Sequence, residues 1–329
     1  MTAFFSIIIP VKEISYYLLF EGLPAFQKQT YKKFEVLVLP DEHVRYDLTL
    51  LRTHRWLRII PTGKITKPGV KRTIGAQKAK GTILAFIDDD AYPKEDWLQQ
   101  AYNAFKRNIS IFCGPGMLAK NTGMWEKVFD EVLKSSLGTG WLNYRYTPGE
   151  KRFVDDYPFM NFFIKKEMYL KLSSVSVYHW PGEDSKICEE LVHKRGYKIL
   201  YVPEVQVYHH RRNNVVSHLR QFGRYGLQRG TFFAEGDRNS RKLLHALPSL
   251  FLIYLGFLLF LFPLNIFSIP FFIYVILTMY LSLKSLFITK NPIVSILFIP
   301  ILFLTHLMYG AMFLKGYWRE KMRYNNTRQ

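Results

Sequence analysis

The chain has 329 residues, and its 45 Lys and Arg against 26 Asp and Glu give a formal net charge of +19. With 49% hydrophobic residues it is long and apolar enough to bury a substantial core, which excludes a disordered chain. The two cysteines, Cys113 and Cys188, lack a C-x-x-C spacing and exclude a disulfide scaffold or a metal knuckle.

The mean hydropathy of -0.03 is an average over two parts of the chain that differ in composition. The stretch 243–314 is strongly apolar, and its only formally charged residues are Lys284 and Lys290. The remainder has a mixed, polar composition. We therefore expect a catalytic domain at 1–212, an amphipathic interfacial linker at 213–242, two to three transmembrane helices at 243–314 and a basic tail at 315–329.

The polar part alternates strand and helix signals. Residues 6–11 form a short β-branched run closed by proline, which predicts a buried strand. Further strands are expected at residues 35–39, 57–60, 83–87, 109–113 and 199–208, and helices at 18–29, 68–80, 97–106 and 185–195. This alternation predicts an α/β fold, Rossmann-like, with a mostly parallel sheet flanked by helices. Ligands of such sheets bind at the carboxyl ends of the strands.

Three consecutive aspartates, Asp88, Asp89 and Asp90, follow the strand expected at residues 83–87. Side chains two residues apart in an extended chain point the same way, which pairs Asp88 with Asp90. Divalent cations such as Mg2+ take oxygen ligands and offset the repulsion between clustered carboxylates. We favour a metal site over a solvated acidic turn in which an Asp caps the next helix.

A second carboxylate pair, Glu183 and Asp184, precedes the helix expected at residues 185–195. Carboxylates at a helix start are stabilised by the helix dipole, so capping accounts for the pair. The functional interpretation is a general base, because a carboxylate beside a reacting alcohol can take its proton. The residues alone leave both interpretations open.

Residues 215–229 mix basic and apolar side chains, with the apolar ones at spacings of about three and four. The pattern is typical of a basic amphipathic helix lying on anionic headgroups, although a solvated helix face would look the same. Its position directly before the apolar stretch favours the membrane interface. The membrane then explains the positive charge without nucleic acid as a partner.

The apolar stretch contains three segments, 243–264, 267–288 and 293–314, each near the ~20 residues that cross a bilayer. Three spans would place the basic end outside, against the bias that keeps Lys and Arg in the cytoplasm. Two spans with one interfacial or re-entrant segment would keep it inside, and both topologies stay open. The N-terminus has no basic leader. We expect a multi-pass protein of the plasma (inner) membrane with a cytoplasmic catalytic domain.

The order of these motifs resembles that of the GT-A family 2 glycosyltransferases, which are inverting enzymes with nucleotide-sugar donors. Asp88-Asp89-Asp90 with the trailing Pro93 is similar to the D-x-D motif of that family, and Glu183-Asp184 to its downstream E-D. The resemblance covers residues 4–230, and its other matching segments are residues 6–13, 29–38, 71–81 and 207–211.

The resemblance implies a role for each matching residue. Asp184 would be the general base, and Asp88 and Asp90, completed by His209, would hold a divalent cation, Mg2+ or Mn2+. The substrate-binding residues that it implies are Pro10, Val11, Glu13, Asp41, Arg72, Asp88, Asp89, Asn161 and Glu183. The chain departs from the family at Pro40, Glu13 and Thr73, which replace an aspartate and two asparagines.

The resemblance implies transfer of a sugar from a nucleotide-diphosphate donor to a hydroxyl of a lipid-linked or cell-surface glycan, with inversion. A polyprenyl-phosphate glycosyltransferase is an alternative. Residues 221–225, Gln-Phe-Gly-Arg-Tyr, resemble the Q-x-x-R-W of processive polysaccharide synthases, but three short apolar segments are too few for their channel. An inactive membrane scaffold is a further alternative, against which the intact Asp88, Asp90 and Asp184 argue.

Overall fold

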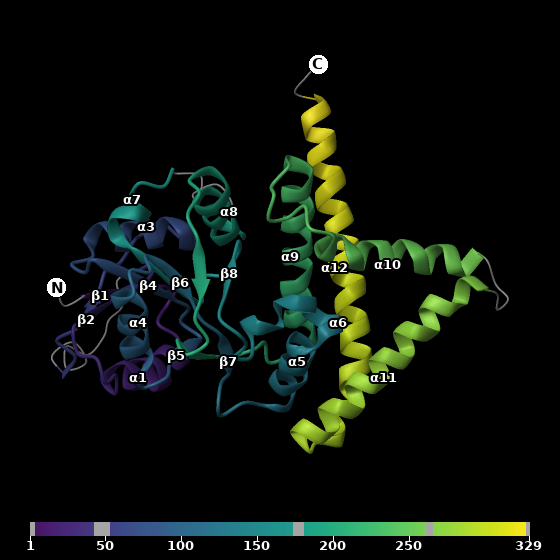
Figure 1. Ribbon diagram of the computed structural model, residues 1–329, viewed down its shortest axis with the longest axis horizontal. Helices are drawn as coiled ribbons and strands as arrows, with labels where there is room; N and C mark the ends of the chain where they lie inside the picture. Colours follow the sequence, from purple (N-terminus) through teal and green to yellow (C-terminus); the bar gives the residue numbers. More distant parts are fainter. Residues whose placement is uncertain (1–3, 43–52, 174–180, 261–265, 327–329) are drawn as a thin grey trace. The chain divides into compact units, whose positions relative to one another are not determined.

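The computed structural model describes residues 4–42, 53–173, 181–260 and 266–326 (Figure 1). The chain forms two compact units. Unit 1 comprises Met1–Ala119 and Thr147–His210, and unit 2 comprises Lys120–Tyr146 and Arg211–Gln329. The boundary at His210 lies near the end of the domain expected over 1–212, and residues 120–146 within that range belong to unit 2. Lys120–Tyr146 packs with the C-terminal helices because it supplies apolar side chains to their core.

Unit 1 is built on an eight-stranded sheet of order β3-β2-β1-β4-β9-β6-β10-β8. Its strands are β1 (Phe5–Pro10), β2 (Phe34–Leu39), β3 (Leu57–Ile59), β4 (Ile83–Ile87), β6 (Ile111–Cys113), β8 (Arg152–Val154), β9 (Asn161–Lys165) and β10 (Ile199–Tyr201). All of them run in one direction except β9 and β8, which pair antiparallel with their neighbours. The expected α/β fold with a mostly parallel sheet is confirmed.

Helices cover both faces of this sheet (Figure 1). They are η1 (Leu18–Gly22), α1 (Leu23–Gln27), α3 (Pro68–Lys78), α4 (Trp97–Lys106), α7 (Lys166–Leu170), α8 (Glu183–Glu189) and η4 (Glu190–Lys194). Because strand side chains alternate, Ile7 of β1 packs in one core with Phe26 of α1 and Trp97 of α4. On the other face, Gly75 of α3 lies against Ile8, leaving no room for a side chain.

A small second sheet, β5-β11-β7, contains the strand that directly follows the three aspartates. Its strands are β5 (Ala91–Pro93), β7 (Gly116–Leu118) and β11 (Val207–His209). The single strand expected at residues 199–208 is wrong, because a turn at Pro203 separates β10 in the large sheet from β11 in the small one. This break pairs His209 with Ala91, directly after the three aspartates.

Unit 2 is helical. Its helices are α5 (Met124–Lys134), α6 (Ser136–Thr139), η2 (Gly140–Arg145), α9 (Val215–Glu235), α10 (Leu243–Phe260), η5 (Ile266–Ser268), α11 (Ile269–Thr289) and α12 (Pro292–Asn326). The expected amphipathic helix is α9, and the expected basic tail continues α12 as helix up to Asn326. Two segments, Ile266–Thr289 and Pro292–Asn325, are long and apolar enough to cross a membrane, and Leu243–Leu259 is a shorter apolar helix.

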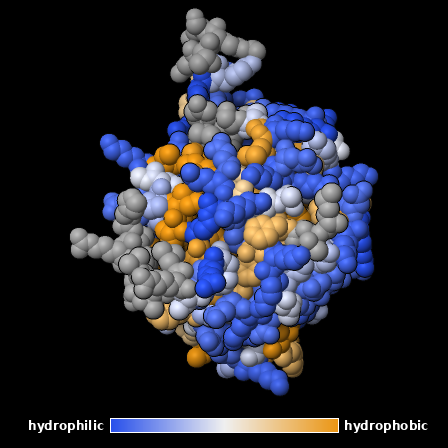
Figure 2. All heavy atoms as spheres, turned by 90° about the vertical axis from the view of Figure 1, so that its left-hand side faces the viewer, coloured by the Kyte–Doolittle hydropathy of each residue, from blue (hydrophilic) through white to orange (hydrophobic). Residues whose placement is uncertain are grey.

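The surfaces of the two units differ in composition. The face shown in Figure 2 is mostly hydrophilic, with a smaller apolar area near its centre. By contrast, α10 and α11 expose large apolar side chains along their length. Leu259 is 80% exposed, Ile276 64% and Phe287 74%. An apolar surface of this kind on helices marks a membrane or protein contact.

Glycines allow α9 to pack directly on the backbone of α12. A Cβ at Gly230 would lie 2.0 Å from the carbonyl oxygen of Phe313, and a Cβ at Gly226 would lie 2.4 Å from that of Tyr309. Gly316 of α12 meets the carbonyl of Leu227 in the same way. The face of α9 that carries these glycines is therefore occupied by α12, and only its other face remains for solvent or headgroups.

We predict that Gly230→Ala destabilises unit 2, since the added methyl group pushes α9 away from α12. Overpacking of this kind costs about 1–3 kcal/mol. Gly256→Ala is the matched control, because nothing lies within 4 Å of its Cβ position and alanine favours helix. Thermal unfolding followed by circular dichroism should show a lower midpoint for Gly230→Ala only. Equal midpoints would contradict the observed packing.

Candidate functional site

The chain after β4 brings two of the aspartates to a histidine of β11. Asp90 Oδ1 lies 2.9 Å from His209 Nε2. One ligand atom each from Asp88, Asp90 and His209 lies within 4.8 Å of the other two, and all three side chains are partly exposed. Carboxylate oxygens and an imidazole nitrogen are suitable ligands for a divalent cation. These three residues therefore fit a divalent-cation site, the grouping that the sequence analysis expected.

Asp89 lies outside this group of ligand atoms. Burial raises the pKa of Asp89 to about 6, and repulsion from Asp90 adds to the effect. The hydroxyl of Ser15 donates to the Asp89 carbonyl oxygen at 3.1 Å, so the loop after β1 holds the aspartate turn. The substrate-binding role expected for Asp89 stays a prediction.

Arg72 of α3 links the aspartate turn to the second carboxylate pair. Its Nη2 donates to Asp88 Oδ1 at 3.2 Å, and its Nη1 donates to Glu183 Oε1 at 2.7 Å. Burial disfavours the charge of Arg72, but Glu183, Asp88 and Asp184 outweigh it and raise the pKa of Arg72. The guanidinium also lies 5.5 Å from the centre of the Phe159 ring. Arg72 thus joins carboxylates of both groups, and the nucleotide contact that the resemblance implied for it stays a prediction.

Asp184 lies in the first turn of α8, beside Glu183. Burial raises the pKa of Asp184 to about 7, repulsion from Glu183 and Asp156 adds to this, and Arg72 opposes it. Asp184 Oδ1 accepts a hydrogen bond from the Ser185 N–H at 2.8 Å. A carboxylate with a pKa near 7 is well suited to accept a proton at neutral pH. Its place in the helix is compatible with capping as well.

Lys71 is a site residue that the sequence analysis missed. Its side chain is 1% exposed, and its ammonium donates to the Leu39 carbonyl at 3.1 Å, to the Val11 carbonyl at 2.5 Å and to the Asp41 carboxylate. It thereby ties the ends of β1 and β2 together and holds Asp41. One signal was available: Lys71 precedes Gly75 by four residues, so both share the face of α3 that packs on the sheet.

The remaining expected substrate contacts fall into two groups. Pro10 and Val11 end β1 at this edge of the sheet, and Glu13 is exposed just beyond them. Asn161 is fully buried; its Oδ1 accepts a hydrogen bond from Trp97 Nε1 at 2.9 Å, and its Nδ2 donates to the Val205 carbonyl at 2.7 Å. Its amide thus links β9 to α4 and to the segment between β10 and β11, and the substrate contact expected for Asn161 stays a prediction.

His210 faces a different environment from His209. Its ring stacks on Tyr17 with centroids 4.0 Å apart, and its Nε2 lies 2.9 Å from Glu21 Oε2. Its backbone N–H donates to the Asp90 carbonyl at 2.9 Å. His210 therefore anchors the end of β11 to η1, next to the cation site.

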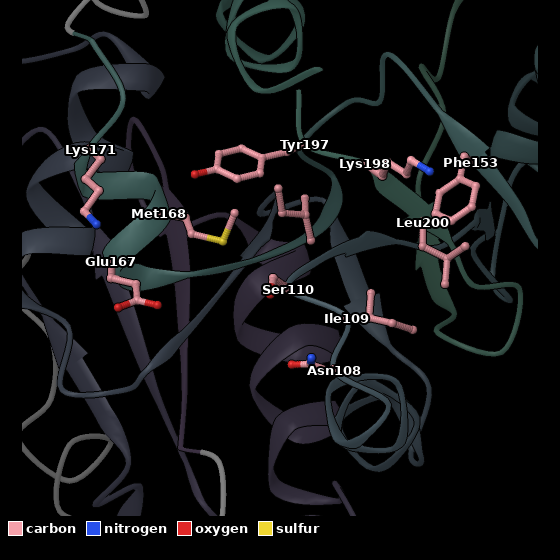
Figure 3. A pocket seen from close by; sticks show the side chains of 11 residues that line it. Asn108, Ile109, Ser110, Phe153, Glu167, Met168, Lys171, Tyr197, Lys198 and Leu200 are labelled. Carbon is pink, nitrogen blue, oxygen red and sulfur yellow. The ribbon is translucent and has the colours of Figure 1, made fainter. Parts of the chain in front are cut away.

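A separate cavity of about 690 Å³ lies elsewhere in unit 1 (Figure 3). Its lining includes Asn108 to Ile111 at the start of β6 and Lys198 and Leu200 at the start of β10. Those are the amino ends of the strands, whereas Asp88 follows the carboxyl end of β4, which runs in the same direction. The cavity is thus distinct from the aspartate site.

Comparison with known proteins matches part of the chain to one family. Residues 6–163 match the family described as Glycosyl transferase family 2. A comparison with curated proteins found no match.

Among solved structures, the chain is similar to S. aureus TarS, with a TM-score of 0.45 and 14% identity over 69% of this chain and 39% of that one. It is also similar to GalNAc-T7 with UDP, GalNAc and Mn2+, with a TM-score of 0.47 and 16% identity over 70% of this chain and 51% of that one. The S. aureus TarS 1-349 structure gives a TM-score of 0.42, 15% identity and coverages of 69% and 65%. This chain therefore matches less than two thirds of each solved chain.

Proposed function

We propose that the chain is a membrane-associated inverting glycosyltransferase, on the premise that its residues 6–163 match glycosyl transferase family 2. The donor is a nucleotide-diphosphate sugar, and the acceptor is a hydroxyl of a lipid-linked or cell-surface glycan. The observation that carries the proposal is the cluster of Asp88, Asp90 and His209, joined through Arg72 to Glu183, the neighbour of Asp184 in α8.

Asp184 is the proposed general base. It takes the proton of the acceptor hydroxyl as that oxygen bonds to the anomeric carbon of the donor sugar. The bond from this carbon to the diphosphate oxygen breaks on the opposite face, so the configuration inverts and the nucleoside diphosphate leaves. Arg72 supports this role because its charge favours the ionised form of Asp184 and fixes Glu183 beside it.

The residues that would hold a divalent cation, Mn2+ or Mg2+, are Asp88, Asp90 and His209. A cation bound there supplies a Lewis acid for the negative charge of the leaving diphosphate. Asp41, held by Lys71, lies at the end of β2 and is the proposed contact for the nucleotide base. Pro10, Val11, Glu13 and Asp89 complete the proposed donor site around it.

The proposed membrane association is the reason for choosing a lipid-linked or cell-surface acceptor. Two helices of unit 2 are long and apolar enough to span a bilayer, and the chain carries a net charge of +19. A basic protein at an anionic membrane surface meets lipid-linked acceptors there. We place it at the plasma (inner) membrane, with unit 1 in the cytoplasm, where nucleotide sugars are available as donors.

The proposal is tested with the full chain in lipid vesicles and a panel of nucleotide-diphosphate sugars. Release of nucleoside diphosphate should require Mn2+ or Mg2+, should favour a subset of the panel, and should increase when lipid-linked acceptors are added. The transferred sugar should show inverted anomeric configuration by NMR. Release that is independent of divalent cation, or a product with retained configuration, would overturn the proposal.

The raised pKa of Asp184 predicts how the rate depends on pH. A carboxyl with a pKa of about 7 is protonated below that pH, so the base of the free enzyme is lost there and kcat/KM should rise with pH through about 7. Arg72→Gln removes a charge that lowers this pKa, so its profile should shift to higher pH. Arg107→Gln, an exposed arginine of the same unit, is the control. An unshifted profile for Arg72→Gln would argue against Asp184 as the titrating base.

A further inference from the structure

One side of α12 is covered by two polar helices of unit 2. Val128, Phe129 and Val132 of α5 form a buried cluster with apolar residues of α12, namely Val294, Phe298, Ile301 and Leu302. Next along the helix, His218 of α9 lies 3.0 Å from Thr305 Oγ1. The glycines of α9 then continue this contact as far as Phe313. The covered side thus extends through the whole apolar part of α12.

The covering helices carry charges that a bilayer core would not accept. A charged side chain at the centre of a bilayer costs about 2.5–3.5 kcal/mol on insertion scales. If α12 crossed the membrane along its axis, α5 and α9 would lie at the same depth as its apolar part. The charged residues that would then enter the hydrocarbon, apart from the buried Glu126 and Asp130 that bind Arg211, are Lys127, Glu131, Lys134, Arg220, Arg224 and Arg229.

The opposite side of unit 2 is apolar and uncovered. α10 and α11 form a hairpin that extends away from α12 (Figure 1). Phe257 is 64% exposed on α10, and Ile276 is 64% exposed on α11. A stripe on α12 continues this surface, since Ile293 is 54% exposed and Ile296 is 68% exposed. One side of α12 therefore faces the charged helices α5 and α9, and the opposite side faces the apolar helices α10 and α11.

The length of α10 limits how deep this hairpin reaches. Ser249 Oγ donates to the Gly310 carbonyl of α12 at 3.1 Å, and the Phe251 ring still lies 6.2 Å from that of Phe303, so α10 leaves α12 beyond these contacts. The ten residues from Ser249 to Leu259 span about 15 Å at ~1.5 Å per residue, which is the most that α10 extends from α12. That is about half of the ~30 Å hydrocarbon thickness. α11 returns to α12, where Ser282 and Ser295 exchange hydrogen bonds.

From these contacts we propose that the chain is monotopic: α12 lies in the membrane plane, and the α10–α11 hairpin enters the acyl chains of one leaflet and returns. α5 and α9 then face water and headgroups. The basic and aromatic end of α12 suits the same interface, because Trp318 is 60% exposed beside Lys315 and Arg319. This topology replaces both expected spanning topologies and does not depend on the proposed activity.

Spin-label depth measurements test the proposal on the full chain in vesicles of zwitterionic and anionic phospholipids. Single cysteines are introduced into a Cys113→Ala, Cys188→Ala background. A nitroxide label is then attached to each cysteine. Its depth is measured by comparing its accessibility to oxygen, which concentrates in lipid, with its accessibility to a water-soluble nickel complex. The α10 sites are Leu247, Ile253 and Leu259, which are 46%, 42% and 80% exposed.

We expect depth to increase continuously from Leu247→Cys to Leu259→Cys. On α12, labels at Ile293, Ile296 and Leu304, which are 54%, 68% and 39% exposed, should report similar depths. If α10 spanned the membrane, the label at Ile253 would instead be the deepest of the three on α10. If α12 spanned the membrane, the depths of its labels would change steadily along the helix. Either result would overturn the proposal.

Tyr225→Cys on the exposed face of α9 is the control and should be accessible from water. Lipid burial of this label would also contradict the topology. Spin–spin broadening at Leu259, with no access to oxygen, would show that a second copy of the chain covers the hairpin instead of lipid.

Discussion

Replacing Asp184 with Asn should lower kcat by about 10²–10⁴-fold, the usual contribution of a general base. The amide keeps the size of the side chain but cannot take the proton of the acceptor hydroxyl. Donor binding depends on other residues in this account, so KM for the nucleotide sugar should change little. Steady-state kinetics on the full chain in lipid vesicles measures both constants.

Glu204→Gln is the matched control for that experiment, because Glu204 is an exposed carboxylate of the same unit. Its kinetics should equal those of the wild type. If Asp184→Asn kept wild-type kcat, another group would have to be the base. Circular dichroism of the variant separates a chemical loss from unfolding, since a variant with the native spectrum and melting temperature has lost chemistry alone.

Replacing Asp90 with Asn should lower kcat/KM by about 10²–10³-fold, because a metal Lewis acid contributes several kcal/mol and each ~1.4 kcal/mol is tenfold. Asp90 contacts His209 and belongs to the cation group, so the variant should also need a higher concentration of Mn2+ for half-maximal rate. Titrating activity against Mn2+ measures this requirement.

Glu95→Gln is the control for Asp90→Asn, since Glu95 is exposed a few residues farther along the chain. Its Mn2+ requirement should match that of the wild type. An unchanged Mn2+ requirement in Asp90→Asn would mean that the aspartates bind no catalytic cation. His209→Gln should raise the requirement in the same direction, because it removes the ligand that β11 supplies.

The layout of unit 1 was predictable because its signals are local. Apolar β-branched runs define β1, β2 and β4, and the aspartates directly after Ile87 stand out against them. Their position at the carboxyl end of a strand follows from parallel topology alone. The link to His209 was expected only through the family resemblance, since 119 residues separate it from Asp90.

The contacts that the sequence did not predict depend on tertiary structure. Lys71 carries a charge, and nothing local shows that two carbonyls and Asp41 satisfy it in the core. Asn161 matched a family segment, but its amide is used by Trp97 and by backbone groups. Burial and long-range hydrogen bonding override residue type in both cases.

Unit 2 shows the same limit on a larger scale. Hydropathy identified α11 and α12 as long apolar helices, and the structure confirms them. Periodicity does not show which face of a helix a distant segment covers. The packing of Lys120–Tyr146 onto α12 therefore had no signal in the sequence, although it decides how α12 can meet a membrane.

The central claim is that Asp88, Asp90 and His209 form one divalent-cation site. Titration of the purified full chain with Mn2+, with free ion followed by its EPR signal and a nucleoside diphosphate present, tests it directly. We predict one bound Mn2+ per wild-type chain, with affinity weakened by at least about tenfold in Asp90→Asn and His209→Gln but not in Glu95→Gln. A wild-type chain that binds no Mn2+, or variants that bind it equally well, would contradict the account.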